Sequence, residues 1–151
     1  MNTADPDKIP YLVIGYGNTL RSDDGAGYWV AETISQWDWA PLRSQAVHQL
    51  TPDLALAIAQ TETVIFIDAT TISSEVIFQP LEVDLTVTFT THFAHPRSLL
   101  ALASTLYQAN PVAYHLLIPA SNFELGEIFS QTTANCCYIA LEKIKNFVGY
   151  P

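Results

Sequence analysis

Three side chains spread along this chain could together bind a metal ion and activate water: Asp24, Asp68 and His92. Asp24 comes shortly after an apolar run at 11–16 that predicts a buried strand, and Asp68 directly follows a second such run at 64–67. His92 lies in a loop before a predicted helix. If the two strands are parallel neighbours, their carboxyl ends meet at one edge of the sheet, where α/β proteins bind ligands. Two carboxylates and an imidazole suit nickel, zinc, iron or manganese.

Each of these residues also has a purely structural interpretation. An aspartate at a strand end often caps the following turn, so Asp68 could be structural. Of the adjacent Asp23 and Asp24, one is expected to cap the next helix. We assign that role to Asp23 and leave Asp24 for chemistry. His95, three residues after His92, is a rival for the histidine position, and spacing alone does not choose between them.

A glycine-rich turn separates the first strand from the paired carboxylates. Gly15 and Gly17 match the start of a dinucleotide-binding fingerprint, but Leu20 stands where the third glycine belongs. The carboxylates of Asp23 and Asp24 would repel a pyrophosphate, and the turn has no lysine for a phosphate-binding loop. The turn therefore favours a cationic ligand over a nucleotide.

Strands and helices are expected to alternate along the chain. Apolar runs and helical periodicity predict strands at 11–16, 45–50, 64–67, 76–83 and 113–118, and helices at 25–37, after 53, after 96 and at 132–148. Alternation of this kind predicts an α/β fold, a three-layer sandwich whose twisted, mostly parallel sheet of about five strands is flanked by helices. We expect a single domain over 1–151, with a flexible leader at 1–9.

Local signals support two of the helices. In Thr51-Pro52-Asp53, the threonine is expected to be the N-cap and the proline the first helical residue. The final helix shows an apolar stripe that includes Cys137, for which we expect core packing rather than catalysis. His48 and His115 fall in predicted strands and are expected to make packing or hydrogen-bond contacts.

Composition restricts the kinds of partner. The 151 residues include only six lysines and arginines and carry a formal charge of −9, which argues against nucleic acid and anionic membranes as partners. No apolar run approaches the roughly 20 residues of a membrane span, and the polar start does not resemble a signal peptide. The two cysteines are adjacent and poorly placed to bridge each other. A cytoplasmic protein is expected.

Several segments resemble one family, the hydrogenase maturation proteases. Residues 15–27 read GYGNTLRSDDGAG and resemble the family's G-x-G-N-x-L-x-x-D-[DE]-x-x-G opening. Matches follow in order at 48–54, at 64–69, and at His92 with 96–100. The segment 118–127 is similar to the late loop of members that serve bidirectional, NAD-linked hydrogenases. The likeness covers nearly the whole chain beyond residue 10.

The resemblance implies a function for the candidate residues. These endopeptidases remove a C-terminal extension from the large-subunit precursor of nickel-iron hydrogenases. Asp24, Asp68 and His92 would contact nickel, and the two aspartates would also be catalytic. The nickel would arrive bound to the substrate, so no tightly held cofactor of the protein's own is expected. A monomer is implied.

The expected hydrolysis is attack by water assisted by the substrate's nickel, with Asp24 or Asp68 orienting or deprotonating the water. Gly17, Asn18 and His95 are expected to lie against the substrate. Two other functions stay open: a nickel sensor or chaperone that binds without cutting, and a small-molecule or nucleotide-binding α/β enzyme.

Overall fold

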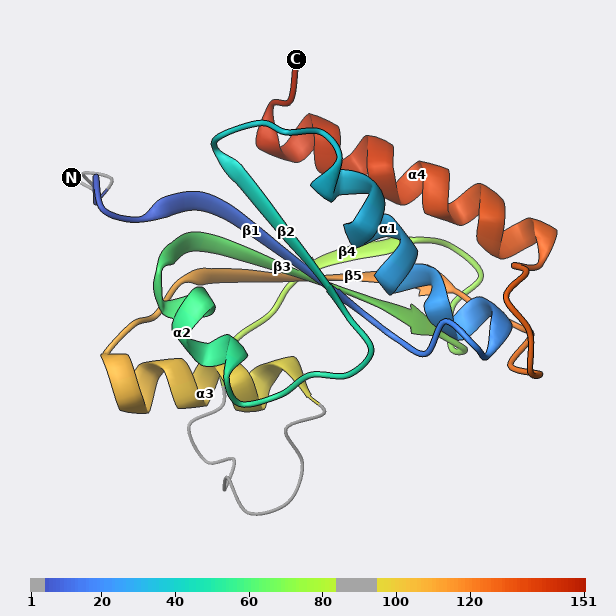
Figure 1. Ribbon diagram of the computed structural model, residues 1–151, viewed down its shortest axis with the longest axis horizontal. Helices are drawn as coiled ribbons and strands as arrows, with labels where there is room; N and C mark the ends of the chain where they lie inside the picture. The colour runs from blue at the N-terminus through green and yellow to red at the C-terminus, as the bar shows by residue number, and fades with distance from the viewer. Residues whose placement is uncertain (1–4, 84–94) are drawn as a thin grey trace.

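The computed structural model describes residues 5–83 and 95–151. In these ranges a five-stranded sheet has the order β2-β1-β3-β5-β4 (Figure 1). The strands are β1 (Ile9–Tyr16), β2 (Leu42–Val47), β3 (Thr61–Thr70), β4 (Ile77–Pro80) and β5 (Val112–Pro119). The helices are the 3-10 turn η1 (Ser22–Gly25), α1 (Ala26–Ser35), α2 (Leu54–Ala59), α3 (Pro96–Tyr107) and α4 (Gln131–Val148). All pairings are parallel except that of β4 with β5.

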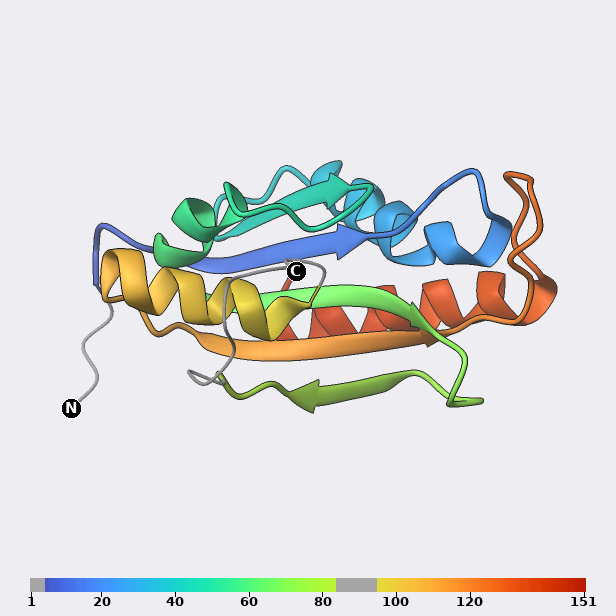
Figure 2. The ribbon, with the colours of Figure 1, turned by 90° about the horizontal axis from the view of Figure 1, so that it is seen from below.

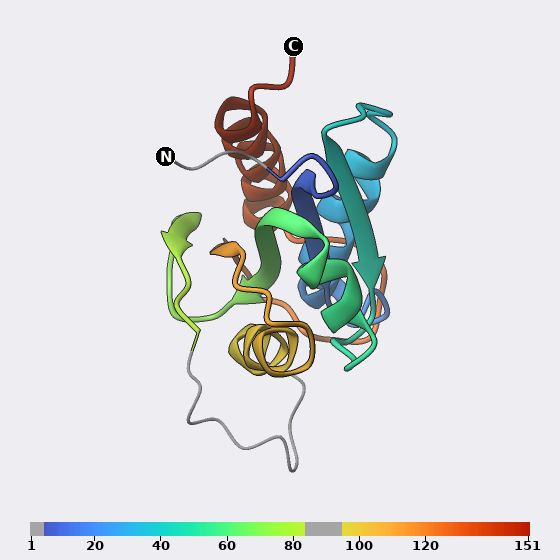
Figure 3. The same cartoon turned by 90° about the vertical axis from the view of Figure 1, so that its left-hand side faces the viewer.

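Two pairs of helices cover the two faces of the sheet. The view along the strands separates α1 and α4 on one face from α2 and α3 on the other (Figure 3). Each face has its own apolar core, with Val13 and Ile65 on the α1/α4 side and Ile14 and Phe66 on the α2/α3 side. The predicted α/β three-layer sandwich is confirmed.

The central strands follow from their composition. The apolar runs of β1 and β3 are buried on both faces, as continuous apolar strands in parallel sheets are. Strand boundaries differ from the predictions. β1 begins at Ile9, inside the predicted leader, and β2 lies at 42–47 rather than 45–50. β4 is a short edge strand that pairs only with β5 and ends at Pro80, whose nitrogen has no hydrogen to donate.

The sequence predicted where the helices lie along the chain more accurately than it predicted their first residues and caps. The prediction of Thr51 as an N-cap is wrong, because 51–53 form a turn and α2 begins at Leu54 without a side-chain cap. Pro96 does begin a helix, with His95 as its N-cap. The apolar stripe of α4 is buried, and burial raises the pKa of the Cys137 thiol to about 12, in keeping with core packing.

Chain topology creates a switch point at one edge of the sheet. From β1 the chain passes through α1 on one face to β2, and from β2 it passes through α2 on the opposite face to β3. After β1 the chain turns to α1, whereas after β3 it turns to β4 on the other side of the sheet, so the two loops diverge at the carboxyl ends of two adjacent parallel strands. Such switch points are where open α/β sheets bind ligands. Both candidate aspartates come from these two loops and strand ends.

Within the described ranges, no helix has both the length and the apolar character needed to cross a membrane.

Candidate active site at the carboxyl edge of β1 and β3

Asp68 lies at the switch point, near the carboxyl end of β3. The pairing of β1 with β3 ends at Ile67, whereas β3 continues beside β5 to Thr70, so Asp68 is the first residue of β3 beyond β1. Burial, together with the negative charge of Asp24, raises the pKa of Asp68 from 3.8 to about 6. Hydrogen bonding from the Ala69 N–H and the Tyr16 hydroxyl acts in the opposite direction. The carboxyl group thus titrates close to neutral pH, as groups that exchange protons in catalysis often do.

Asp24 is held by the glycine turn. Its Oδ2 accepts a hydrogen bond of 2.8 Å from the backbone N–H of Asn18. The Asn18 side chain in turn accepts from the N–H of Leu20 at 2.9 Å, so Asn18 fastens the turn. Because the Asn18 N–H already serves Asp24, this amide is not free to bind a phosphate. The turn presents a carboxylate rather than an anion-binding nest.

Glycine is required at position 17 of this turn. Its φ is +151°, which side chains rarely adopt, and a Cβ there would collide with the backbone carbonyl of Asp24. The absence of a side chain lets the end of β1 approach η1 closely. Gly17 therefore acts on Asp24 through backbone geometry, while its predicted contact with a substrate stays a prediction.

Asp23 does not cap α1, and that prediction is wrong. The carboxylate is fully buried and accepts four hydrogen bonds from three residues of the segment 119–130, which precedes α4. The donors are the N–H groups of Ser121 and Asn122 and both the N–H and the hydroxyl of Ser130. Burial alone would raise the pKa of Asp23, but these hydrogen bonds outweigh it and lower the pKa to about 2. Asp23 therefore ties the segment 119–130, called the late loop below, to η1. Figure 2 shows this orange segment beside the blue one that contains η1.

Tyr16, which the sequence did not single out, lies beside Asp68, and His115 contacts Tyr16. The Tyr16 hydroxyl and Nε2 of His115 are 3.3 Å apart, and both residues lie on the α2/α3 side of the sheet. Burial and the nearby Asp68 carboxylate raise the pKa of Tyr16, so its hydroxyl stays protonated. Burial and the charges of His95 and Arg97 lower the pKa of His115 to about 4. The expected hydrogen-bond role of His115 is confirmed.

Two histidines, His92 and His95, are candidates for the third metal-contacting position. His92 lies outside the described residues. His95 is described, and its Nδ1 accepts a hydrogen bond of 3.1 Å from the N–H of Arg97. A neutral imidazole with an acceptor Nδ1 carries its proton on Nε2, so His95 has no remaining lone pair for a metal while it caps α3. Partial burial and the Arg97 charge lower the pKa of His95, which keeps the ring neutral near pH 7.

Within residues 5–83 and 95–151, no group of three or more acidic, histidine or cysteine side chains is arranged so that it could hold a metal ion. The described members of the predicted set are the two aspartates, and the electrostatic effect of Asp24 on Asp68 shows that they share one environment. This pair could help to complete the coordination sphere of a cation that already carries other ligands.

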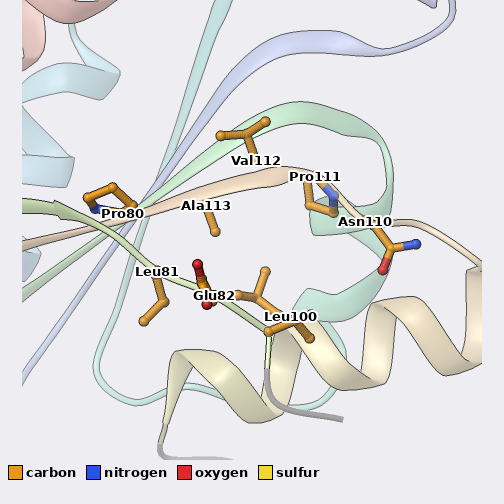
Figure 4. Close-up of a pocket in the computed structure, with 9 residues that line it drawn as sticks. Pro80, Leu81, Glu82, Leu100, Asn110, Pro111, Val112 and Ala113 are labelled. Carbon is orange, nitrogen blue, oxygen red and sulfur yellow. The ribbon is translucent and has the colours of Figure 1, made fainter.

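A cavity lies at the end of the sheet opposite to Asp68. It has a volume of about 500 Å³ and is mostly apolar, with Leu81, Leu100, Val112 and Ala113 among the residues in Figure 4. These residues come from the end of β4, the middle of α3 and the start of β5. Because β5 is parallel to β3, this cavity is at the amino edge, away from Asp68.

Comparison with known proteins identifies the fold. No family model and no curated protein matches the sequence. Solved structures do match. A hydrogenase 2 maturation peptidase from Thaumarchaeota archaeon SCGC_AB-539-E09 is 21% identical, with a TM-score of 0.70 over 94% of this chain and 99% of that one. The [NiFe] hydrogenase maturation protease HycI from Thermococcus kodakarensis KOD1 is 19% identical, with a TM-score of 0.72 over 93% of each chain. The hydrogenase maturating endopeptidase HybD from E. coli is 18% identical, with a TM-score of 0.66 over 92% of this chain and 91% of that one.

The chain has the hydrogenase maturation protease fold. The likeness extends over nearly the full length of each of these structures. At this level of identity the comparison establishes the fold, and the function is argued from the site.

Proposed function

We propose that this protein is an endopeptidase that removes the C-terminal extension of a nickel-loaded [NiFe] hydrogenase large-subunit precursor. One observation carries the proposal: Asp24 follows β1 and Asp68 is the first residue of β3 beyond its pairing with β1, so both lie at the adjacent carboxyl ends of these strands, in a fold shared with hydrogenase maturation peptidases. The opening motif in the sequence supplies both the turn that holds Asp24 and the glycines that bring it toward β3.

The nickel belongs to the substrate in this proposal. A precursor that already binds nickel through its own ligands would leave positions for the carboxylates of Asp24 and Asp68 and for the imidazole of His92. His92 is preferred to His95 because the lone pair on Nδ1 of His95 is engaged by Arg97. A site that binds nickel weakly by itself and well on the loaded precursor would distinguish loaded from empty substrate.

Asp68 has properties that suit proton transfer. Its pKa of about 6 leaves most of the group ionised near pH 7, yet the group is basic enough to accept a proton from an attacking water molecule. Substrate-bound nickel would polarise the scissile carbonyl. Asp24, held by the Asn18 N–H, would orient the cation or the water. Tyr16 keeps its proton and donates a hydrogen bond to the Asp68 carboxylate.

The test is incubation with purified large-subunit precursor, with and without nickel, followed by mass spectrometry of the precursor's C-terminus. We expect truncation that depends on nickel and falls by at least roughly a hundredfold in Asp24→Asn and in Asp68→Asn. Asp53→Asn is the matched control, because this exposed carboxylate makes no capping hydrogen bond. Wild-type-like cleavage in both site variants would overturn the proposed mechanism.

Binding without cutting would point to the alternative function. A wild-type protein that forms a complex with the nickel-loaded precursor but never shortens it would act as a nickel sensor or chaperone of hydrogenase assembly. The precursor of a bidirectional, NAD-linked hydrogenase is the first substrate to test, because the segment 118–127 is similar to the late loop of proteases that serve these enzymes. We infer that the protein acts as a cytoplasmic monomer without a tightly held cofactor of its own.

A further inference from the structure

A second cavity adjoins the candidate active site on the α1 side. It has a volume of about 320 Å³ and lies between the first turn of α1 and the late loop. Thr19 and Gly25, which flank Asn18 and Asp24 in the chain, form part of its wall. Its remaining lining residues are Tyr28, Trp29, Phe129, Glu32 and Glu127, which define the aromatic–acidic pocket. Figure 2 shows the late loop passing beside the first turns of the blue segment that forms this wall.

The aromatic side chains of the pocket are fixed by packing. The ring of Trp29 meets that of Phe129 edge-on at 6.2 Å and that of Tyr138 at 5.7 Å. Tyr28 is stacked on His48 with ring centroids 5.0 Å apart. Rings held in this way form a preorganised apolar wall, and aromatic faces attract cations.

The acidic side chains of the pocket have no cationic partner in the described ranges. The ion pair found there joins Lys145 to Glu142 on α4, far along the chain from Glu32 and Glu127. The basic residue of the opening turn, Arg21, donates through Nε to the carbonyl of Phe123 and does not line the pocket. Both carboxylates are solvent-exposed, line the cavity beside the aromatic rings and make no ion pair within the described ranges.

The volume and the charge of the aromatic–acidic pocket indicate which kind of ligand it could hold. The volume is at the lower end of the roughly 300–1,000 Å³ of ligand pockets, enough for one long side chain rather than a cofactor. We propose that the aromatic–acidic pocket binds one cationic side chain, arginine or lysine, of the polypeptide that enters the candidate active site. The polypeptide's identity as hydrogenase precursor rests on the proposed function, but the chemistry of the pocket does not.

A small-molecule titration tests the pocket without proteolysis. The probe is N-acetyl-arginine amide, and its neutral match is N-acetyl-citrulline amide, which has nearly the same shape. Binding is followed through the indole N–H resonance of Trp29, identified among the three tryptophans with Trp29→Phe. We expect a saturable shift with the arginine probe and binding roughly tenfold weaker with the citrulline probe.

Charge-removal variants complete the test. Glu32→Gln combined with Glu127→Gln is expected to abolish saturable binding of the arginine probe. Glu62→Gln combined with Glu82→Gln removes the same charge outside the pocket and is expected to leave binding unchanged. The proposal is overturned if the arginine probe fails to saturate, if both probes bind equally, or if the Glu32/Glu127 variant binds like wild type.

The precursor provides a second readout. In the Glu32/Glu127 variant we expect KM for the precursor to rise about tenfold with kcat unchanged, because the lost contact is made equally before and during reaction. An unchanged KM would count against the pocket. If the wild-type protein never cleaves precursor, the proposed function fails, while the probe titration still decides whether the pocket binds a cationic side chain.

Discussion

At Asp68, burial and a neighbouring negative charge both disfavour the ionised carboxylate. Its pKa rises from 3.8 to about 6 on folding, so the folded protein binds more protons than the unfolded chain between these two values. Stability is therefore lost as pH increases through this window. About two pKa units correspond to about 3 kcal/mol. The folded protein thus loses stability when Asp68 ionises, and a carboxyl group with such a cost is tolerated where its ionised form has a function.

We predict that Asp68→Asn stabilises the nickel-free protein at pH 7. The gain in free energy of unfolding should approach about 3 kcal/mol at pH 7 and disappear at about pH 3, below both pKa values, where the wild-type carboxyl is protonated in the folded and the unfolded state. Urea unfolding of both proteins in chelator at the two pH values measures this difference. Asp24→Asn should give a smaller gain in the same direction, because it removes one of the charges that raise the pKa of Asp68. Equal pH dependence of the wild type and Asp68→Asn would contradict the assignment.

Among the structural elements, the late loop depends on one buried carboxylate. Asn at position 23 would replace one of the acceptor oxygens of Asp23 with a donor amide facing N–H groups. We predict that Asp23→Asn lowers the free energy of unfolding by about 3 kcal/mol. Native-state hydrogen exchange should accelerate most at Ser121, Asn122 and Ser130, because their N–H groups donate hydrogen bonds to the Asp23 carboxylate. Asp53→Asn serves again as the control, and exchange that stays unchanged in the loop would show that Asp23 does not hold it.

Contact of α1 with the sheet depends on glycines. A Cβ on Gly27 would collide with the backbone carbonyls of Tyr16 and Ile67, and a Cβ on Gly15 would collide with that of Gly27. The helix can therefore lie directly on β1 and β3, which brings η1 and Asp24 toward Asp68.

We predict that Gly27→Ala destabilises the protein by about 2 kcal/mol or more, because overpacking displaces α1 from the sheet. It should also weaken the coupling of the two aspartates, seen as a lower pKa of Asp68 in a carboxyl-resolved NMR titration. Glu32→Ala, on the exposed side of the same helix, should change stability little. A Gly27→Ala protein as stable as wild type would mean that the helix moves without cost.

For the whole molecule, the two ends of the parallel sheet have different roles. The carboxyl edge carries the two aspartates and the aromatic–acidic pocket, whereas the amino edge carries the apolar cavity of Figure 4. We predict that Val112→Thr and Glu82→Gln at the amino edge leave precursor cleavage within about twofold of wild type, since exposed positions of this kind perturb the fold little. The same cleavage measurement that tests Asp24→Asn applies. Loss of cleavage in these variants, with intact circular dichroism, would place part of the substrate at the amino edge.

Much of the fold could be predicted from local patterns. The runs at 11–16 and 64–67 predict buried parallel strands because strands covered on both faces need no alternation of polar residues. Pro96 and the stripe of α4 predict helices for equally local reasons. Boundaries were less accurate at β2 and β4, where edge positions relax the demand for apolar residues.

Sequence by itself determined the fold class, the glycine turn and the two aspartates, because strand burial, helix periodicity and backbone sterics act over a few residues. Only the tertiary structure decided what the carboxylates do. Asp23 finds its partners about a hundred residues later, and Tyr16 meets His115 across β3. The pKa of Asp68 and the aromatic–acidic pocket likewise arise from segments that are distant in the chain and adjacent in space. Burial and electrostatic coupling depend on that adjacency, which no local pattern contains.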